Sequence, residues 1–181
     1  MKRILTAFVV VALIGAVPII GFAKTECNGT ITGTVNGGIT VSDGDDCILN
    51  GATVNGGVKM SGGTLEACGS TLNGSVDATG GTCITLGLGP DDAPATCASD
   101  LINGHVSLQN VTGGSGCPGV ANIEIEGSNI NGGADLDNNG SIQLEGNTIQ
   151  GSLDCEGNGS VTNEGITNTV TGQEKGQCAG L

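Results

Sequence analysis

The sequence has no tryptophan and no tyrosine, and its two phenylalanines, Phe8 and Phe22, lie near the N-terminus. Its single arginine, Arg3, lies there too, so the chain from residue 24 onward has no aromatic residue and only three lysines against 18 acidic residues. A compact globular core normally depends on aromatic side chains for its volume. Nucleic acids and anionic membranes attract Lys and Arg. These absences therefore argue against an ordinary globule, a nucleic-acid partner and a membrane-surface partner.

The first 23 residues have the features of a secretory signal. Lys2 and Arg3 precede an apolar stretch from Ile4 to Ile20, and Gly21-Phe22-Ala23 offers small residues at the positions that signal peptidase recognises. The alternative is an uncleaved membrane anchor, which needs about 20 apolar residues. Gly15 and Pro18 interrupt the stretch and favour cleavage. We predict a signal peptide over residues 1–23, an exported domain over 24–181, and an extracellular or periplasmic location.

All eight cysteines follow the predicted signal, and an even number in an exported chain indicates a disulfide framework. A zinc site is disfavoured, because the chain has no Cys-x-x-Cys motif and only one histidine. The predicted disulfide-forming residues are Cys27, Cys47, Cys68, Cys83, Cys97, Cys117, Cys155 and Cys178.

A seven-residue pattern recurs along the chain. Counting from an apolar residue at position 0, apolar residues follow at positions 4 and 6, and glycine usually occupies position 2, as in Val54 to Met60. Copies begin at residues 35, 54, 72, 102, 130 and 149, and a degenerate copy begins at 166. The uninterrupted spacings are 19, 18, 19 and 17 residues. The two longer gaps contain runs of Gly, Pro and Asp, which predict loop insertions near 87–100 and 112–120.

Apolar residues alternate within each copy, which is the periodicity of a strand. A second alternating pair follows several copies: Leu65/Ala67, Ile84/Leu86, Ile123/Ile125 and Ile142/Leu144. A repeat of this size buries its apolar face only by stacking on its neighbours. We therefore predict one all-β domain, a parallel and right-handed β-helix (β-solenoid) of about seven coils with 17–19 residues each.

Position 1 carries an amide side chain in six copies. Stacked amides can hydrogen-bond along a column, so we predict a structural ladder, with a recognition surface as the alternative. The glycine at position 2 is expected to supply the positive φ of a corner. The predicted ladder comprises Asn36, Asn55, Asn73, Asn103, Asn131 and Gln150.

The recurring pattern Val-x-Gly-x-Val-x-Ala, seen in Leu72 to Ala78, is similar to the repeats of bactofilins, the polymer-forming β-helices of bacteria. The resemblance covers most of residues 31–172 and implies a triangular parallel β-helix that associates end to end. Bactofilins are cytoplasmic, whereas this chain has a predicted signal and cysteines, so the resemblance extends to the architecture and not to a cytoskeletal role. A left-handed hexapeptide helix fits less well, because apolar residues do not recur strictly every six positions.

Acidic residues occupy the outward positions 5 and 7 of two neighbouring copies. Stacking would gather Asp135, Asp137, Asp154 and Glu156 into one patch, with Asn138, Asn139 and Asn158 beside it. Like charges on neighbouring strands repel, and Ca²⁺, which prefers oxygen ligands, would offset that repulsion. The patch is either a Ca²⁺ site or a solvated acidic surface. A second acidic column, Glu126, Glu145 and Glu164, is interpreted as a solubility feature.

Enzymatic activity is not expected. Long β-helices occur among polysaccharide lyases and pectinases, whose sites need basic residues and paired acids in a groove. After residue 23 the chain has no arginine and little lysine, and no Ser or Cys has an identifiable base partner. We identify no catalytic residue, and no cofactor is expected apart from a possible Ca²⁺.

Ice binding is another alternative, because Thr and Asn flank position 0 in regular pairs that resemble the flat faces of disulfide-rich antifreeze solenoids. Leu101 and Gly165 interrupt the threonine column, and threonine is also simply a good strand residue. The pairs are Thr34/Asn36, Thr53/Asn55, Thr71/Asn73, Asn129/Asn131 and Thr148/Gln150.

We therefore expect a non-enzymatic, exported structural or adhesive β-solenoid that associates with itself, a surface or a glycan. A Ca²⁺-dependent surface- or glycan-binding module and an ice-binding protein are the alternatives. Open solenoid ends expose strand edges, so end-to-end homo-oligomerisation is expected unless the segments before Ile31 and after Val170 act as caps. Disulfides between adjacent coils are expected to dominate, with Cys47–Cys68 and Cys83–Cys97 as the expected pairs.

Overall fold

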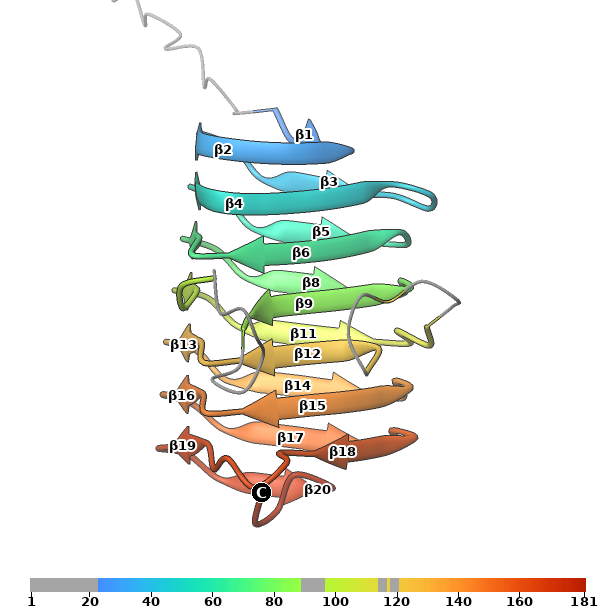
Figure 1. Cartoon of the computed structure of the whole chain (residues 1–181), viewed down its shortest axis with the longest axis vertical. Helices are drawn as coiled ribbons and strands as arrows, with labels where there is room; N and C mark the ends of the chain where they lie inside the picture. Colours follow the sequence, from blue (N-terminus) through green and yellow to red (C-terminus); the bar gives the residue numbers. More distant parts are fainter. Residues whose placement is uncertain (1–22, 89–96, 114–116, 118–120) are drawn as a thin grey trace, which may run out of the picture.

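The structure, a computed structural model, describes residues 23–88, 97–113, 117 and 121–181. These residues form a rod of short parallel strands stacked along its length (Figure 1). Within this part of the chain every regular element is a β-strand. The predicted parallel β-solenoid is confirmed. The predicted signal lies outside the described residues apart from Ala23, as do residues 89–96, 114–116 and 118–120 of the two predicted insertions.

One sheet takes one strand from each successive coil, and all its pairings are parallel. Its eight strands are β1 (Thr25–Glu26), β3 (Ile39–Val41), β5 (Val58–Met60), β8 (Val76–Ala78), β11 (Val106–Gln109), β14 (Ala134–Asp137), β17 (Leu153–Glu156) and β20 (Glu174–Gly176).

The second sheet has twelve strands and bends at β4 (Asp46–Val54), which also pairs with β2 (Gly29–Val35). One half of β4 pairs with β6 and the other half with β7. We call the β6 side the insertion face: β6 (Thr64–Cys68), β9 (Cys83–Gly87), β12 (Ile123–Glu126), β15 (Ser141–Glu145) and β18 (Ser160–Thr162). We call the β7 side the threonine–asparagine face: β7 (Thr71–Leu72), β10 (Leu101–Ile102), β13 (Asn129–Ile130), β16 (Thr148–Ile149) and β19 (Thr169–Val170).

The position-0 residues form one register column through the rod. Val35 pairs with Val54 and so on to Ile149, as the repeat predicts. The last copy is displaced: Ile149 pairs with Val170 and not with Ile166. The predicted start at 166 is therefore wrong. The last coil keeps its glycine at position 2, Gly172, but carries Glu174 and Gly176 where earlier coils are apolar.

The core consists of stacked aliphatic side chains without any aromatic ring. The column Val54, Leu72, Ile102, Ile130 and Ile149 is at most 1% exposed. The second alternating pairs, from Leu65/Ala67 to Ile142/Leu144, are equally buried. Each coil therefore excludes water only because its neighbours cover it, which ties the stability of one repeat to the next.

The glycine at position 2 has a different role from the one expected. At Gly56 an added Cβ would lie 2.6 Å from the backbone nitrogen of Gly38 in the preceding coil. Equivalent Cβ atoms at Gly74, Gly104, Gly132 and Gly151 would lie 2.4–2.6 Å from backbone atoms. None of these glycines has a positive φ. They are required by close backbone approach between coils, whereas positive φ occurs at other corners, such as Gly127 and Gly146.

Four disulfides join all eight cysteines, and they differ from the two expected pairs. The pairs are Cys27–Cys47, Cys68–Cys97, Cys83–Cys117 and Cys155–Cys178. Cys47–Cys68 is wrong because Cys47 is in register with Leu65, and Cys68 with Asn50.

Cys83–Cys97 is wrong because Cys83 begins β9, whereas the first insertion leaves β9 at its other end, after Gly87. Each insertion instead has its own disulfide, from Cys68 to Cys97 and from Cys83 to Cys117. Disulfides of this kind are typical of proteins from oxidising compartments. No helix in the described part of the chain has the length and apolar character to cross a membrane.

Candidate functional site

Five asparagines at position 1 form a continuous hydrogen-bonded ladder along one corner of the rod. From Asn55 onward, each side-chain Nδ2 donates to the Oδ1 of the asparagine in the preceding coil. The distances are 3.2, 2.9, 2.8 and 2.7 Å for Asn55–Asn36, Asn73–Asn55, Asn103–Asn73 and Asn131–Asn103. Gln150 occupies position 1 of the next coil, and its backbone N–H donates to the Ile130 carbonyl oxygen. The hydrogen-bonded ladder runs from Asn36 to Asn131, and its hydrogen bonds lie between exposed side chains.

The threonine–asparagine face carries a second column beside the ladder. Thr34, Thr53 and Thr71 are in register, and Thr148 pairs with Thr169. Leu101 and Asn129 interrupt the column between them. Because the last coil begins at Val170, its threonine is Thr169, and Gly165 does not interrupt the array as expected. The face is thus more regular than the sequence alone indicates.

The predicted acidic patch is assembled by the register, but a histidine and a lysine flank it. Asp135 pairs with Asp154, and Asp137 with Glu156. His105 Nε2 lies 3.0 Å from Asp135 Oδ2, and Lys175 Nζ lies 3.8 Å from Asp154 Oδ2. The His105 side chain is 40% exposed beside Asp135. These contacts reduce the repulsion that motivated the Ca²⁺ hypothesis.

Two amides predicted to lie beside the patch are buried and bound to the backbone. Asn139 Nδ2 donates to the Leu108 carbonyl at 2.9 Å, and Asn158 Nδ2 to the Leu136 carbonyl at 2.7 Å. Their Oδ1 atoms accept from the backbone N–H groups of Val111 and Asn139. The described residues contain no group of three or more His, Cys, Asp or Glu arranged to hold a metal ion. The Ca²⁺ site at Asp135, Asp137, Asp154 and Glu156 stays a prediction.

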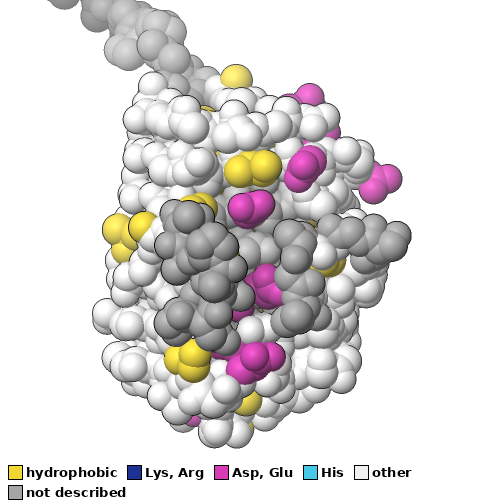
Figure 2. All heavy atoms as spheres, viewed as in Figure 1, with side chains coloured by type: hydrophobic (Ala, Val, Ile, Leu, Met, Phe, Trp, Pro, Cys, Tyr) yellow, Lys and Arg dark blue, Asp and Glu magenta, His cyan; other side chains and the backbone are white. Residues whose placement is uncertain are grey.

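A row of polar residues on the insertion face is buried, contrary to the interpretation of this region as a solubility feature. Glu126 and Glu145 are in register and are 1% and 0% exposed, whereas Glu164 is exposed. Glu124 and Gln143 lie beside them at 7% and 4% exposed, with Gln143 Nε2 donating to Glu145 Oε1 at 2.8 Å. Figure 2 shows acidic side chains gathered along this side of the rod.

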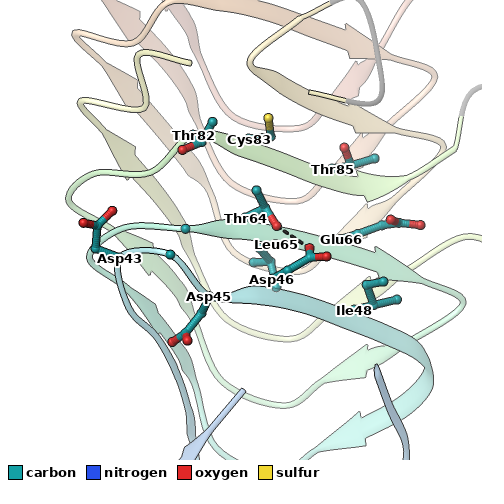
Figure 3. Close-up of a pocket in the computed structure, with 12 residues that line it drawn as sticks. Asp43, Asp45, Asp46, Ile48, Thr64, Leu65, Glu66, Thr82, Cys83 and Thr85 are labelled. Atoms are coloured by element: carbon teal, nitrogen blue, oxygen red, sulfur yellow. Dashed lines mark hydrogen bonds between the residues drawn. The ribbon is translucent and has the colours of Figure 1, made fainter. Parts of the chain in front are cut away.

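A shallow cavity of about 480 Å³ lies on the insertion face nearer the N-terminal end. Figure 3 shows the carboxylates of Asp43, Asp45, Asp46 and Glu66 around it. Thr64 Oγ1 donates to Asp46 Oδ1, and the half-buried side chain of Ile48 adds apolar surface. Among the residues that the structure describes, no basic or aromatic side chain lines this cavity. Its chemistry suits a neutral or cationic group better than an anion.

Asp100 is a buried carboxylate that sequence reasoning missed. It is 0% exposed, and its two oxygens accept from the backbone N–H groups of Ser70 at 2.6 Å and Gly87 at 2.8 Å. Burial raises the pKa of Asp100 from 3.8 to about 6, although both hydrogen bonds lower it. Asp100 therefore holds the base of the first insertion, between the point where the chain leaves β9 and the point where it rejoins at β10.

Asp100 belongs to a column of polar residues two positions before position 0. This constant spacing is the feature of the sequence from which the column could have been predicted. Ser70, Ser128, Asn147 and Asn168 occupy the same place in other coils. Asn147 Nδ2 donates to the Ile125 carbonyl at 2.6 Å, and its Oδ1 accepts from Ser128 N–H at 2.9 Å. The column satisfies backbone groups at a corner where the strands part.

Comparisons with known protein families, curated proteins and solved structures find no match to this chain. The function is therefore argued from the arrangement of its own residues.

Proposed function

We propose that this protein is an exported, non-enzymatic β-solenoid with a structural or adhesive role at or near the cell surface. The observation that carries the proposal is the stapling of a repetitive rod by four disulfides, which use all eight cysteines. Such a framework suits an oxidising environment outside the cytoplasm. The bactofilin-like repeat is consistent with a scaffold that works by association.

The geometry supports association more than catalysis. In the part of the chain that the structure describes, the polar columns connect one coil to the next, as in the Asn36–Asn131 ladder and the Asn139–Asn158 pair. The single His–Asp pair, His105 with Asp135, is about half exposed, with His105 directly before β11 and Asp135 within β14. Stiffness and a regular surface are the properties that these contacts provide.

A sedimentation assay with cell envelopes tests the proposal. The oxidised protein beginning at Lys24 is mixed with washed envelopes of the source cells, and the pellet is quantified at increasing protein concentration. We expect saturable co-sedimentation that is lost when the protein is reduced and unfolded. Protein that stays in the supernatant at every concentration would contradict an adhesive role. Immunodetection in cytoplasmic and exported fractions tests the location, and a cytoplasmic pool alone would contradict export.

Ice binding is a second candidate, favoured by the regular array on the threonine–asparagine face. The Thr34–Thr53–Thr71 column and the asparagine ladder run side by side with the spacing of parallel strands, about 4.8 Å per coil. Thermal hysteresis of the purified protein measures this activity. A freezing-point depression that Thr71→Lys abolishes and Lys59→Thr leaves unchanged would support it. The absence of any hysteresis would exclude it.

A further inference from the structure

The chain contains nine Asn-Gly pairs, and five of them begin at the ladder asparagines. An Asn-Gly pair is chemically labile, because the backbone nitrogen of the glycine can attack the side-chain carbonyl carbon of the asparagine, and glycine has no side chain to obstruct that attack. The attack has two requirements. The asparagine side chain must be free to turn toward the nitrogen, and the ring that forms must have room.

The three inner ladder asparagines meet neither requirement. Asn55, Asn73 and Asn103 each donate one side-chain hydrogen bond and accept another. The glycine after each of them packs on the preceding coil, where an added Cβ would lie 2.4–2.6 Å from a backbone atom. Gly56 also donates its backbone N–H to the Gly37 carbonyl oxygen at 3.0 Å, so its nitrogen is engaged. Stacking of the coils therefore blocks the reaction within the ladder.

Two further pairs are protected by burial. The Asn139 and Asn158 side chains are 4% and 7% exposed. Each donates Nδ2 to a backbone carbonyl oxygen and accepts a backbone N–H at Oδ1. Both side chains are thus held at each end of the amide.

Asn50 meets both requirements. Its side chain is exposed and, within the described part of the chain, makes no hydrogen bond. Gly51 lies at the bend of β4, between the half that pairs with β6 and the half that pairs with β7. A Cβ added at Gly51 would meet no described atom within 4 Å. Asn28 is nearly as open, because its Oδ1 accepts only a long hydrogen bond of 3.5 Å and Gly29 is equally uncrowded.

We propose that Asn50 is a site of spontaneous deamidation, and that the ladder shields its own Asn-Gly pairs from the same reaction. The Gly51 nitrogen bonds to Asn50 Cγ and loses its proton, while the Cγ–Nδ2 bond breaks and the amide nitrogen leaves as ammonia. Water then opens the cyclic imide at either carbonyl, which leaves an aspartyl or isoaspartyl unit with no change of oxidation state. The new carboxylate lies at the bend of β4, in register with Cys68 of the next coil. This inference is independent of the proposed adhesive role.

Ageing of the oxidised protein beginning at Lys24 at mildly alkaline pH tests the proposal. Peptides are prepared at acidic pH, which suppresses further deamidation, and electron-transfer fragmentation in a mass spectrometer separates the aspartyl from the isoaspartyl product. We expect Asn50 to react first and Asn28 next. The three inner ladder asparagines should react at least about tenfold more slowly than Asn50, because each must first break two hydrogen bonds.

The reduced and denatured chain is the reference for the sequence alone, and its nine pairs should react at similar rates. Asn50 that stays intact in the folded protein but reacts in the denatured chain would overturn its assignment as the modified site. Inner ladder asparagines that react as fast as Asn50 in the folded protein would overturn the shielding.

Asn73→Ala tests whether the ladder bonds themselves protect. The substitution removes the acceptor of Asn103 Nδ2 and the donor to Asn55 Oδ1, so both neighbours should react several times faster, whereas Asn131 keeps its bond to Asn103. Thr148→Ala, on the same face but outside the ladder, is the matched control and should leave every rate unchanged. Unchanged rates at Asn55 and Asn103 in folded Asn73→Ala would contradict protection by the ladder. If Asn73→Ala does not fold, the comparison of folded and denatured unsubstituted protein decides both parts of the proposal.

Discussion

Asn73 donates its side-chain amide to Asn55 Oδ1 at 2.9 Å, although 18 residues of chain separate them. Asn73 Oδ1 in turn accepts from Asn103, 30 residues further on, at 2.8 Å. The two separations differ because an insertion lies in one coil, yet the two contacts are equivalent. The ladder therefore follows the stacking of coils and not the distance along the chain.

Replacement of Asn73 by alanine is expected to cost about 1–3 kcal/mol, because it removes two side-chain hydrogen bonds of about 0.5–1.5 kcal/mol each. Asn36 is the end of the ladder and makes one such bond, so Asn36→Ala should cost about half as much. Urea unfolding with intact disulfides measures both. Equal losses at the two positions would contradict a ladder whose bonds contribute separately.

Gly56→Ala is expected to destabilise the rod by about 3 kcal/mol or more, because overpacking here pushes against backbone. The new Cβ would lie 2.6 Å from the Gly38 nitrogen and 2.8 Å from the Gly37 carbonyl carbon. Gly80→Ala is the control, since its Cβ would meet its nearest atom, the Ser61 oxygen, at 3.1 Å. The two thermal midpoints should differ clearly. Similar midpoints would show that the coils can separate at Gly56 without cost.

The free energy of unfolding is expected to fall as the pH rises from about 4 to about 6, because of Asp100. In the unfolded chain its carboxyl ionises near 3.8, whereas burial holds the folded pKa at about 6. Between these values the folded state binds more protons, so the stabilisation by protonated Asp100 is complete below pH 4 and gone above pH 6. A difference of about two pH units corresponds to a loss of about 3 kcal/mol.

Comparison of Asp100→Asn with the unsubstituted protein isolates this contribution. Asparagine keeps one acceptor oxygen where Asp100 has two, so the variant is expected to lose the hydrogen bond from Ser70 or Gly87 and to be less stable at every pH. Stability measured between pH 4 and 7 should lose its decline in Asp100→Asn and keep it in Asp43→Asn, which removes an exposed carboxylate. A pH profile unchanged by Asp100→Asn would mean that other groups cause the decline.

Removal of the Cys155–Cys178 disulfide by the double substitution Cys155→Ala/Cys178→Ala is expected to cost about 3 kcal/mol. The bond closes a separation of 23 residues, and its loss frees the unfolded chain while leaving small gaps in the core. Hydrogen exchange should rise first in residues 174–181. Exchange that rises equally along the whole rod would show that the cap and the coils unfold as one unit.

The repeat predicted the coils because two requirements recur in each of them. Position 2 must be glycine where the backbones of neighbouring coils approach closely, and positions 0, 4 and 6 must be aliphatic where the next coil buries them. The repeat did not predict the start of the last coil, because only the first of these requirements holds there. Gly172 is still required, since its Cβ would lie 2.5 Å from the Gly151 oxygen. The aliphatic residues are not required, because no further coil covers Glu174. Glycine was therefore the better guide to register at the end of the rod.

The buried polar residues were harder to predict. Alternation correctly places Glu124 and Gln143 on the outer side of their strands, but it does not tell whether that side is covered. The buried position of Asp100 was not predicted, because the first insertion separates it in sequence from Gly87, one of its two hydrogen-bond donors. The two expected disulfides were wrong because the cysteines were paired by their proximity in the sequence. Strand register determines which cysteines lie close together, and Cys47 and Cys68 are three positions out of register.

The register of the position-0 column makes one coil an interchangeable module. Ile130 and Ile149 are equivalent, and residues 131–149 contain no cysteine, so excising that segment would splice Ile130 to Gln150 with each column resumed in the next coil. The rod would become shorter by one strand spacing, about 4.8 Å. A gene encoding such a chain can set the reach of its product in discrete steps, by duplicating or losing whole coils, while both ends keep their present structure.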